Sequence, residues 1–204
     1  IAFGEILDFR TAFRSGSPRL SPNTASFVAV EAIPGENETN PAQAFAGGYF
    51  SGEFVMGVLD PISSQNAEDG VLVGFKRDRA AGVWATNWSL QVQCEVGDAR
   101  ITDVAISPLG NIYVGGTFEG DATFDRPPPL TQIRLSELQG DEALISFIAI
   151  ASPTGEWLNA FVVPGMELRS LALDSGGEIF VTGPPVLARR LDRTGQVLWS
   201  VALE

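Results

Sequence analysis

Three segments of this chain share one pattern, and that repetition limits the fold more than any other feature. Each segment holds a branched apolar residue, an alanine and a second branched apolar residue, and after a turn it reaches an aromatic residue and ends on a glycine. The closing glycines, Gly48, Gly116 and Gly183, are 68 and 67 residues apart. A nearly constant period of this length indicates a repeated supersecondary unit.

A second pattern alternates with the first. It is an apolar run, a turn ending in glycine and a segment with tryptophan, at residues 71–84, 144–158 and 186–199. The two patterns together therefore predict that each full unit contains two β-hairpins in series. If the copies superpose, three sets of residues should be equivalent and buried: Val28, Val104 and Leu171; Phe45, Tyr113 and Phe180; and Trp84, Trp157 and Trp199.

The strands of these units are nearly continuous apolar runs without strict alternation of apolar and polar residues. Such runs are typical of sheets covered on both faces. The chain also has 22 glycines and 13 prolines spread along its 204 residues, which favours many turns between short strands. The sequence therefore predicts an all-β fold of four-stranded antiparallel meanders stacked face to face.

Residues 191–199, followed by a segment such as 101–118, resemble the bacterial seven-bladed β-propeller repeat. The resemblance implies a single propeller-like domain over 1–204, with about three to four blades and a ring that is incomplete in this chain. The units would be approximately 1–56, 71–125 and 143–185, with a partial unit at 186–204. It also implies a secreted, periplasmic or cell-surface location, and no common catalytic residues.

Closure of the ring is a separate question, because a blade hides its faces only between two neighbours. Residues 4–9 and 195–199 both align with the same half-motif, so the two ends do not complement each other into one blade. Pairing of the terminal strands into a small ring remains one alternative. We favour the other, in which a protein partner or a second copy covers the ends and the chain alone is not a stable monomer.

Charge and composition exclude several classes of partner. The formal net charge of -12 disfavours nucleic acid and anionic lipid. No apolar run is long enough to span a membrane, so no membrane insertion is expected. Binding is expected in the three longest loops, 34–41, 58–70 and 126–142, and residues 131–139 could form one or two helical turns.

The absence of histidine removes the commonest catalytic sets, including a Ser-His-acid triad and imidazole metal sites. Glu119, Asp121 and Asp125 are the candidates for a paired-acid glycosidase or a calcium site, but we favour a solvated turn between units for this segment, because charged loop runs are usually solvated. Trp88 lacks a counterpart in the repeat and is therefore the candidate for stacking on a ligand such as a sugar. Cys94, without a histidine partner, is expected to be a passive thiol.

These observations predict a non-catalytic protein-interaction or structural module of an extracytoplasmic protein or larger assembly. No catalytic residue, metal or cofactor is assigned, and calcium at the Glu119–Asp125 segment is the one cofactor left open. The alternative is a propeller that binds or cleaves carbohydrate, which requires exposed aromatic residues and convergent acids on one rim.

Overall fold

The computed structural model describes residues 24–35, 41–64, 68–78, 82–94, 96–125, 132–136 and 145–202. All regular structure in these ranges is β-strand, and none of it is helix. The expectation of an all-β fold is confirmed. Residues 4–9, and most of the 34–41 loop, lie outside the described residues.

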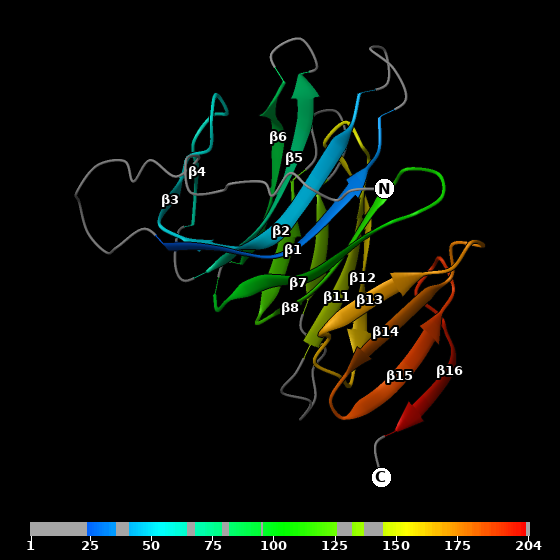
Figure 1. Ribbon diagram of the computed structural model, residues 1–204. Coiled ribbons are helices and arrows are strands. Elements are labelled where there is room, and N and C mark those ends of the chain that lie inside the picture. The colour runs from blue at the N-terminus through cyan, green and yellow to red at the C-terminus, as the bar shows by residue number, and fades with distance from the viewer. Residues whose placement is uncertain are drawn as a thin grey trace.

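Among the described residues, the strands form three main antiparallel sheets, each built on a meander of four strands in chain order, and one separate two-stranded sheet. The first sheet contains β1 (Thr24–Ile33), β2 (Gln43–Ser51), β5 (Asp69–Asp78) and β6 (Val83–Cys94). The second contains β7 (Ala99–Ile106), β8 (Ile112–Phe118), β11 (Ile145–Ala151) and β12 (Trp157–Pro164). The third contains β13 (Ser170–Leu173), β14 (Ile179–Gly183), β15 (Val186–Leu191) and β16 (Val197–Ala202). Figure 1 shows the sheets as an array that runs from blue β1 to red β16.

This grouping differs from all the units expected, 1–56, 71–125, 143–185 and 186–204, because β5 and β6 join β1 and β2 while β7 and β8 join the second sheet. β11 and β12 belong to the second sheet, and β15 pairs with β14 and β16, so the last hairpin completes the third sheet and does not begin a fourth. The difference arises because each sheet joins one copy of the first pattern to the copy of the second pattern that follows it.

A short hairpin is inserted between the second and third strands of the first two sheets. In the first sheet it is β3 (Glu53–Phe54) with β4 (Ile62–Ser63), and in the second it is β9 (Asp121–Phe124) with β10 (Ile133–Ser136). β9 also pairs with the edge of β6, which extends the first sheet to six strands. The helical turn considered for residues 131–139 is therefore wrong over Ile133–Ser136, where apolar Leu135 is buried in the core.

Strand register shows which residues are equivalent. Phe45, Tyr113 and Phe180 each lie on the second strand of a sheet, three residues before the closing glycine. Their counterparts across the first strand pair are Glu31, Ala105 and Ala172. Phe45 and Tyr113 are buried, whereas Phe180 is only partly buried.

The expected equivalence of Val28 with Val104 and Leu171 is wrong by two residues. Val104 pairs with Val114 and Leu171 with Val181, but the matching Ala46 pairs with Val30. Val28 falls in a β-bulge between Phe27 and Ala29 and is 49% exposed. A bulge adds one unpaired residue and changes which face the following side chains occupy, and a sequence pattern does not reveal it.

A close backbone contact explains the repeated glycine. A β-carbon on Gly48, Gly116 or Gly183 would fall on the backbone carbonyl oxygen of Ser26 in β1, Arg100 in β7 or Glu167 just before β13, respectively. In the first two sheets this carbonyl immediately precedes the bulge, because Phe27 pairs with Gly48 and Ile101 with Gly116. Only a residue without a side chain allows the two backbones to approach so closely.

The sheets pack face to face through a second glycine position. A β-carbon on Gly47 would meet Ile101 and Val104, which are side chains of the next sheet, and one on Gly115 would meet Leu168 and Leu171 at or just before β13. One hydrophobic cluster thus joins the first and second sheets, and another joins the second and third. We call the face of each sheet that points to the next one along the chain its trailing face.

A polar contact accompanies the packing of the second sheet on the third. Asp103 on β7 accepts hydrogen bonds through Oδ2 from the Ser170 hydroxyl and the Leu171 backbone amide, both at 2.7 Å. Buried Ser146 donates to the Met166 carbonyl and accepts from the Leu168 amide, both also at 2.7 Å. These bonds fix the segment that leads into β13.

Replacing Gly116 with alanine should destabilise the chain by about 1–3 kcal/mol, because the added carbon overlaps the Arg100 carbonyl and backbone must move. Gly176→Ala is the matched control, since its nearest neighbour is the movable Asp174 carboxylate at 3.2 Å. Urea unfolding measures both changes. Equal losses of unfolding free energy in the two variants would contradict the role assigned to Gly116.

Candidate functional site

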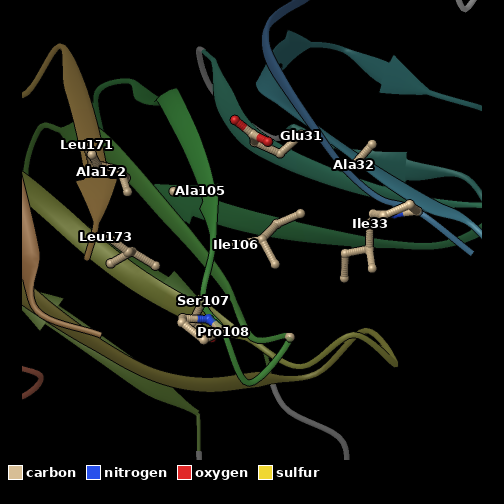
Figure 2. A pocket seen from close by; sticks show the side chains of 12 residues that line it. Glu31, Ala32, Ile33, Ala105, Ile106, Ser107, Pro108, Leu171, Ala172 and Leu173 are labelled. Atoms are coloured by element: carbon tan, nitrogen blue, oxygen red, sulfur yellow. The ribbon is translucent and has the colours of Figure 1, made fainter. Parts of the chain in front are cut away.

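The first strands of the three sheets converge on a pocket of about 490 Å³. Its walls are residues 31–34 of β1 and the chain after it, 105–108 of β7 and the turn after it, and 171–173 of β13, with Gly110. Figure 2 shows that these residues arrive from three separate strands. Glu31, Ala105 and Ala172 occupy equivalent register positions, so the pocket is built by the repeat itself.

Most of the side chains that line this pocket are apolar. Glu31 is its one carboxylate, and the Ser107 hydroxyl oxygen accepts a hydrogen bond from the Asn111 backbone amide at 3.1 Å. General acid-base work needs two titratable groups in reach of one substrate, and a nucleophile needs a base beside it. The residues that line this pocket offer neither of these pairs.

The three acids proposed from the sequence are exposed and do not converge. Glu119 lies in the turn between β8 and β9, where its amide donates to the Asp98 carbonyl. Asp121 begins β9 and Asp125 follows its end, where its carboxylate accepts from Gln132 at 2.6 Å. Asp121 and Asp125 are four residue steps apart along extended chain, which separates their α-carbons by roughly 13 Å.

Such a separation does not suit a retaining glycosidase, in which the two carboxyl groups lie about 5 Å apart. Among the described residues, no group of three or more His, Cys, Asp or Glu side chains is placed to hold a metal ion. Calcium binding at this segment remains a prediction.

Trp88 is not the exposed contact residue that the sequence predicted. It is 9% exposed, it stacks on Phe45 with ring centroids 5.7 Å apart, and its indole NH donates to the Pro153 carbonyl of the second sheet. A β-carbon on Gly155, in the same turn as Pro153, would also collide with the Trp88 ring. Trp88 therefore joins the first sheet to the second.

The other tryptophans do not occupy matching positions either. Trp88 and Trp199 hold the same position in their sheets. Trp88 pairs with Gly74, which pairs with Phe45, and Trp199 pairs with Arg190, which pairs with Phe180. Trp157 lies two residues earlier on its strand, pairs with Ala151 and is fully buried against Phe124. Trp84 lies farther out, opposite Arg77. Bulges at Gly74, Ile150 and Arg190 displace each strand from the spacing of the sequence motif.

A buried acid that the sequence analysis did not single out lies beside the cysteine. Asp69 is 3% exposed and accepts hydrogen bonds from the Cys94 backbone amide at 3.1 Å and from the Gln91 side chain at 2.7 Å. Burial raises the pKa of the Asp69 carboxyl in spite of these bonds. Nothing in the sequence distinguishes it from the many surface acids.

Cys94 has the character expected of a passive thiol. Burial, together with the charges of Asp69, Asp98 and Glu119, raises the pKa of Cys94 to about 12. The thiolate is the reactive form, so the thiol is held in its inert state at neutral pH. Nearby, Arg100 bonds to Glu68 and Asp98 and lies over the Tyr49 ring, 5.1 Å from its centroid.

Asp69→Asn should raise the melting temperature at neutral pH, and the gain should shrink as the pH is lowered. Because the pKa of Asp69 is raised in the folded chain, the folded state binds its proton more tightly than the unfolded state does. Wild-type stability therefore falls as pH rises through that pKa, and the asparagine variant escapes this loss.

The measurement is thermal unfolding across the acidic to neutral range, with Asp121→Asn as the exposed control that should track the wild type. A gain that instead grows toward acid pH would show that the Asp69 charge stabilises the fold.

No protein-family model matches the chain, and no curated protein matches it in a sequence search. Across the described residues, no helix is long and apolar enough to cross a membrane.

Proposed function

We propose that the sheets are blades of a β-propeller and that the chain is a non-catalytic protein-interaction module. The proposal is supported by the constant register of three meanders and by sheet-on-sheet contacts that recur at Gly47 and Gly115. Propellers are the common solution for four-stranded sheets stacked in this way. An extracytoplasmic location is part of the proposal and rests on the repeat resemblance.

The observation that carries the interaction function is the trailing face of the third sheet. Phe180, Arg190 and Trp199 lie opposite one another across β14, β15 and β16, and directly opposed residues share a face. Trp199 is 39% exposed and Val201, opposite Ala188 on the same side, is 47% exposed. Contiguous apolar surface of this kind marks interaction sites on soluble proteins.

Trp199→Ser should lower the fluorescence of an apolar dye such as anilinonaphthalene sulfonate bound to the dilute chain, because the indole is the largest exposed apolar group on this face. Leu158→Ser, a change at a similarly exposed residue of the second sheet, is the control and should leave the signal unchanged. Dye fluorescence that is unchanged in Trp199→Ser would argue against a docking surface there. Glycan-array binding lost in the Trp199 variant would instead support the carbohydrate alternative.

A panel of chromogenic glycosides, esters and peptides should remain at background with the wild-type chain. The physical reason is that Glu119, Asp121 and Asp125 are dispersed and that the pocket offers a single carboxylate. Turnover that disappears in Asp121→Asn or Glu119→Gln would overturn the non-catalytic proposal. The two variants also serve as controls for contaminating activity, which they would not change.

A further inference from the structure

The pocket at the meeting point of the three first strands contains one charged side chain that departs from the repeat. At the register position opposite the aromatic residue, β7 has Ala105 and β13 has Ala172, whereas β1 has Glu31. Packing between the sheets does not require a charge here, because alanine occupies the position in two sheets out of three. The carboxylate therefore calls for a different explanation.

The Glu31 side chain has no partner. Within the described part of the chain it makes no hydrogen bond or ion pair, and none of the residues that line the pocket is basic. Two other carboxylates on or beside the same strands do have partners, since Asp103 accepts from the Leu171 amide at 2.7 Å and Asp174 from the Glu178 amide at 2.9 Å. Figure 2 shows the Glu31 carboxylate pointing away from β1 toward β7.

Backbone groups on the open edges of the sheets add hydrogen-bonding capacity. β1, β7 and β13 are edge strands, and the amides of Ser107 and Asp174 donate to the second strand of their sheets. Backbone groups alternate in direction along an antiparallel strand, so those of Ile106 and Leu173, one residue earlier, turn away from the second strand. Ala32 holds the same position on β1. All three of these residues line the pocket.

The rest of the wall is apolar. Ile33 and Pro34 come from the first sheet, Ile106 and Pro108 from the second, and Leu173 from the third. Figure 2 shows these side chains around one common space. Its volume of about 490 Å³ falls within the range of small-molecule sites, about 300–1,000 Å³, and such sites combine mostly apolar walls with a few polar groups.

We propose that this pocket binds a small organic ammonium ion, that is, a positively charged amine on an apolar body. The ammonium group pairs with Glu31 and donates hydrogen bonds to the outward carbonyls, and the apolar body lies against Ile33, Ile106 and Leu173. The net charge of -12 attracts cations and repels anions. This site goes beyond the protein-interaction function and lies on residues other than those around Trp199.

The test is a titration of the full nitrogen-15-labelled chain with hexylamine, followed by the amide signals in NMR spectra. We expect a dissociation constant on the order of 1 mM, as suits a ligand of this size. The amide signals of Ile106 and Leu173 should shift, and that of Trp199 should not. Hexanol, with the same apolar body and no charge, should bind about threefold or more weakly, and hexanoate should not bind.

Substitutions of Glu31 provide the second arm. Glu31→Gln keeps the size and removes the charge, so it should weaken hexylamine binding about three- to tenfold and leave hexanol binding unchanged. Glu156→Gln removes the same charge from an exposed turn and is the matched control, which should bind as the wild type does. Glu31→Lys should lose hexylamine binding and gain hexanoate binding, and a gain of this kind cannot result from misfolding.

Three outcomes would overturn the proposal: hexanol binding as tightly as hexylamine, hexylamine binding unchanged in Glu31→Gln, or signal shifts centred on Trp199. A fourth concerns the source of the amine. A short peptide with one lysine between glycines and blocked ends should bind no more tightly than hexylamine. Binding of the peptide that is tighter by about tenfold or more would assign the pocket to a basic residue of a partner protein.

A failure here is distinguishable from a failure of the proposed function. The dye experiment reports on the face that carries Trp199, and the amine titration reports on the pocket beside Glu31. Either result can be negative while the other is positive.

Discussion

The close approach of two backbones at a single glycine organises each sheet of this protein. A carbonyl oxygen beside the bulge of the first strand occupies the space that a β-carbon on Gly48 or Gly116 would need, and the Glu167 carbonyl just before β13 does the same at Gly183. The bulge sets the face on which the next apolar residues lie, and those residues cover the glycine one position earlier in the preceding sheet. Local strand geometry and packing between sheets therefore depend on the same few atoms.

That dependence explains how far the sequence could predict the fold. The period of the glycines, the aromatic residue before them and the all-β class could be predicted from composition and spacing, because glycine and aromatic residues are identified directly by their residue type. The bulges are not visible, since any residue can occupy one. Val28 was therefore aligned two residues from its true counterpart, and the three tryptophans were treated as equivalent although Trp157 and Trp199 differ by two positions.

The candidate site shows the same limit in another form. Trp88 was singled out because it had no counterpart in the sequence motif. The strand register nevertheless shows that Trp88 and Trp199 occupy equivalent positions in their sheets. One is enclosed by a following sheet and the other is not, so identical positions differ in exposure through context alone. Asp69 was overlooked for the converse reason: its burial arises from the neighbouring strand end at Cys94, which no local pattern encodes.

The trailing face of the third sheet differs in composition from those of the first two. Arg190 stands where the second sheet has buried Ile150 and the first has Gly74, and it lies over the Phe180 ring with its centroid 5.7 Å away while pairing with Glu178. Permanent burial of this face would carry the free-energy cost of removing the Arg190 charge from water. Where this face is exposed to water, the guanidinium covers the Phe180 ring in a cation–π contact. The two internal junctions are packed by glycine and aliphatic side chains, whereas this face carries Arg190 beside the exposed Trp199, so the same register position serves as tight packing in two sheets and as a charged, solvated surface in the third.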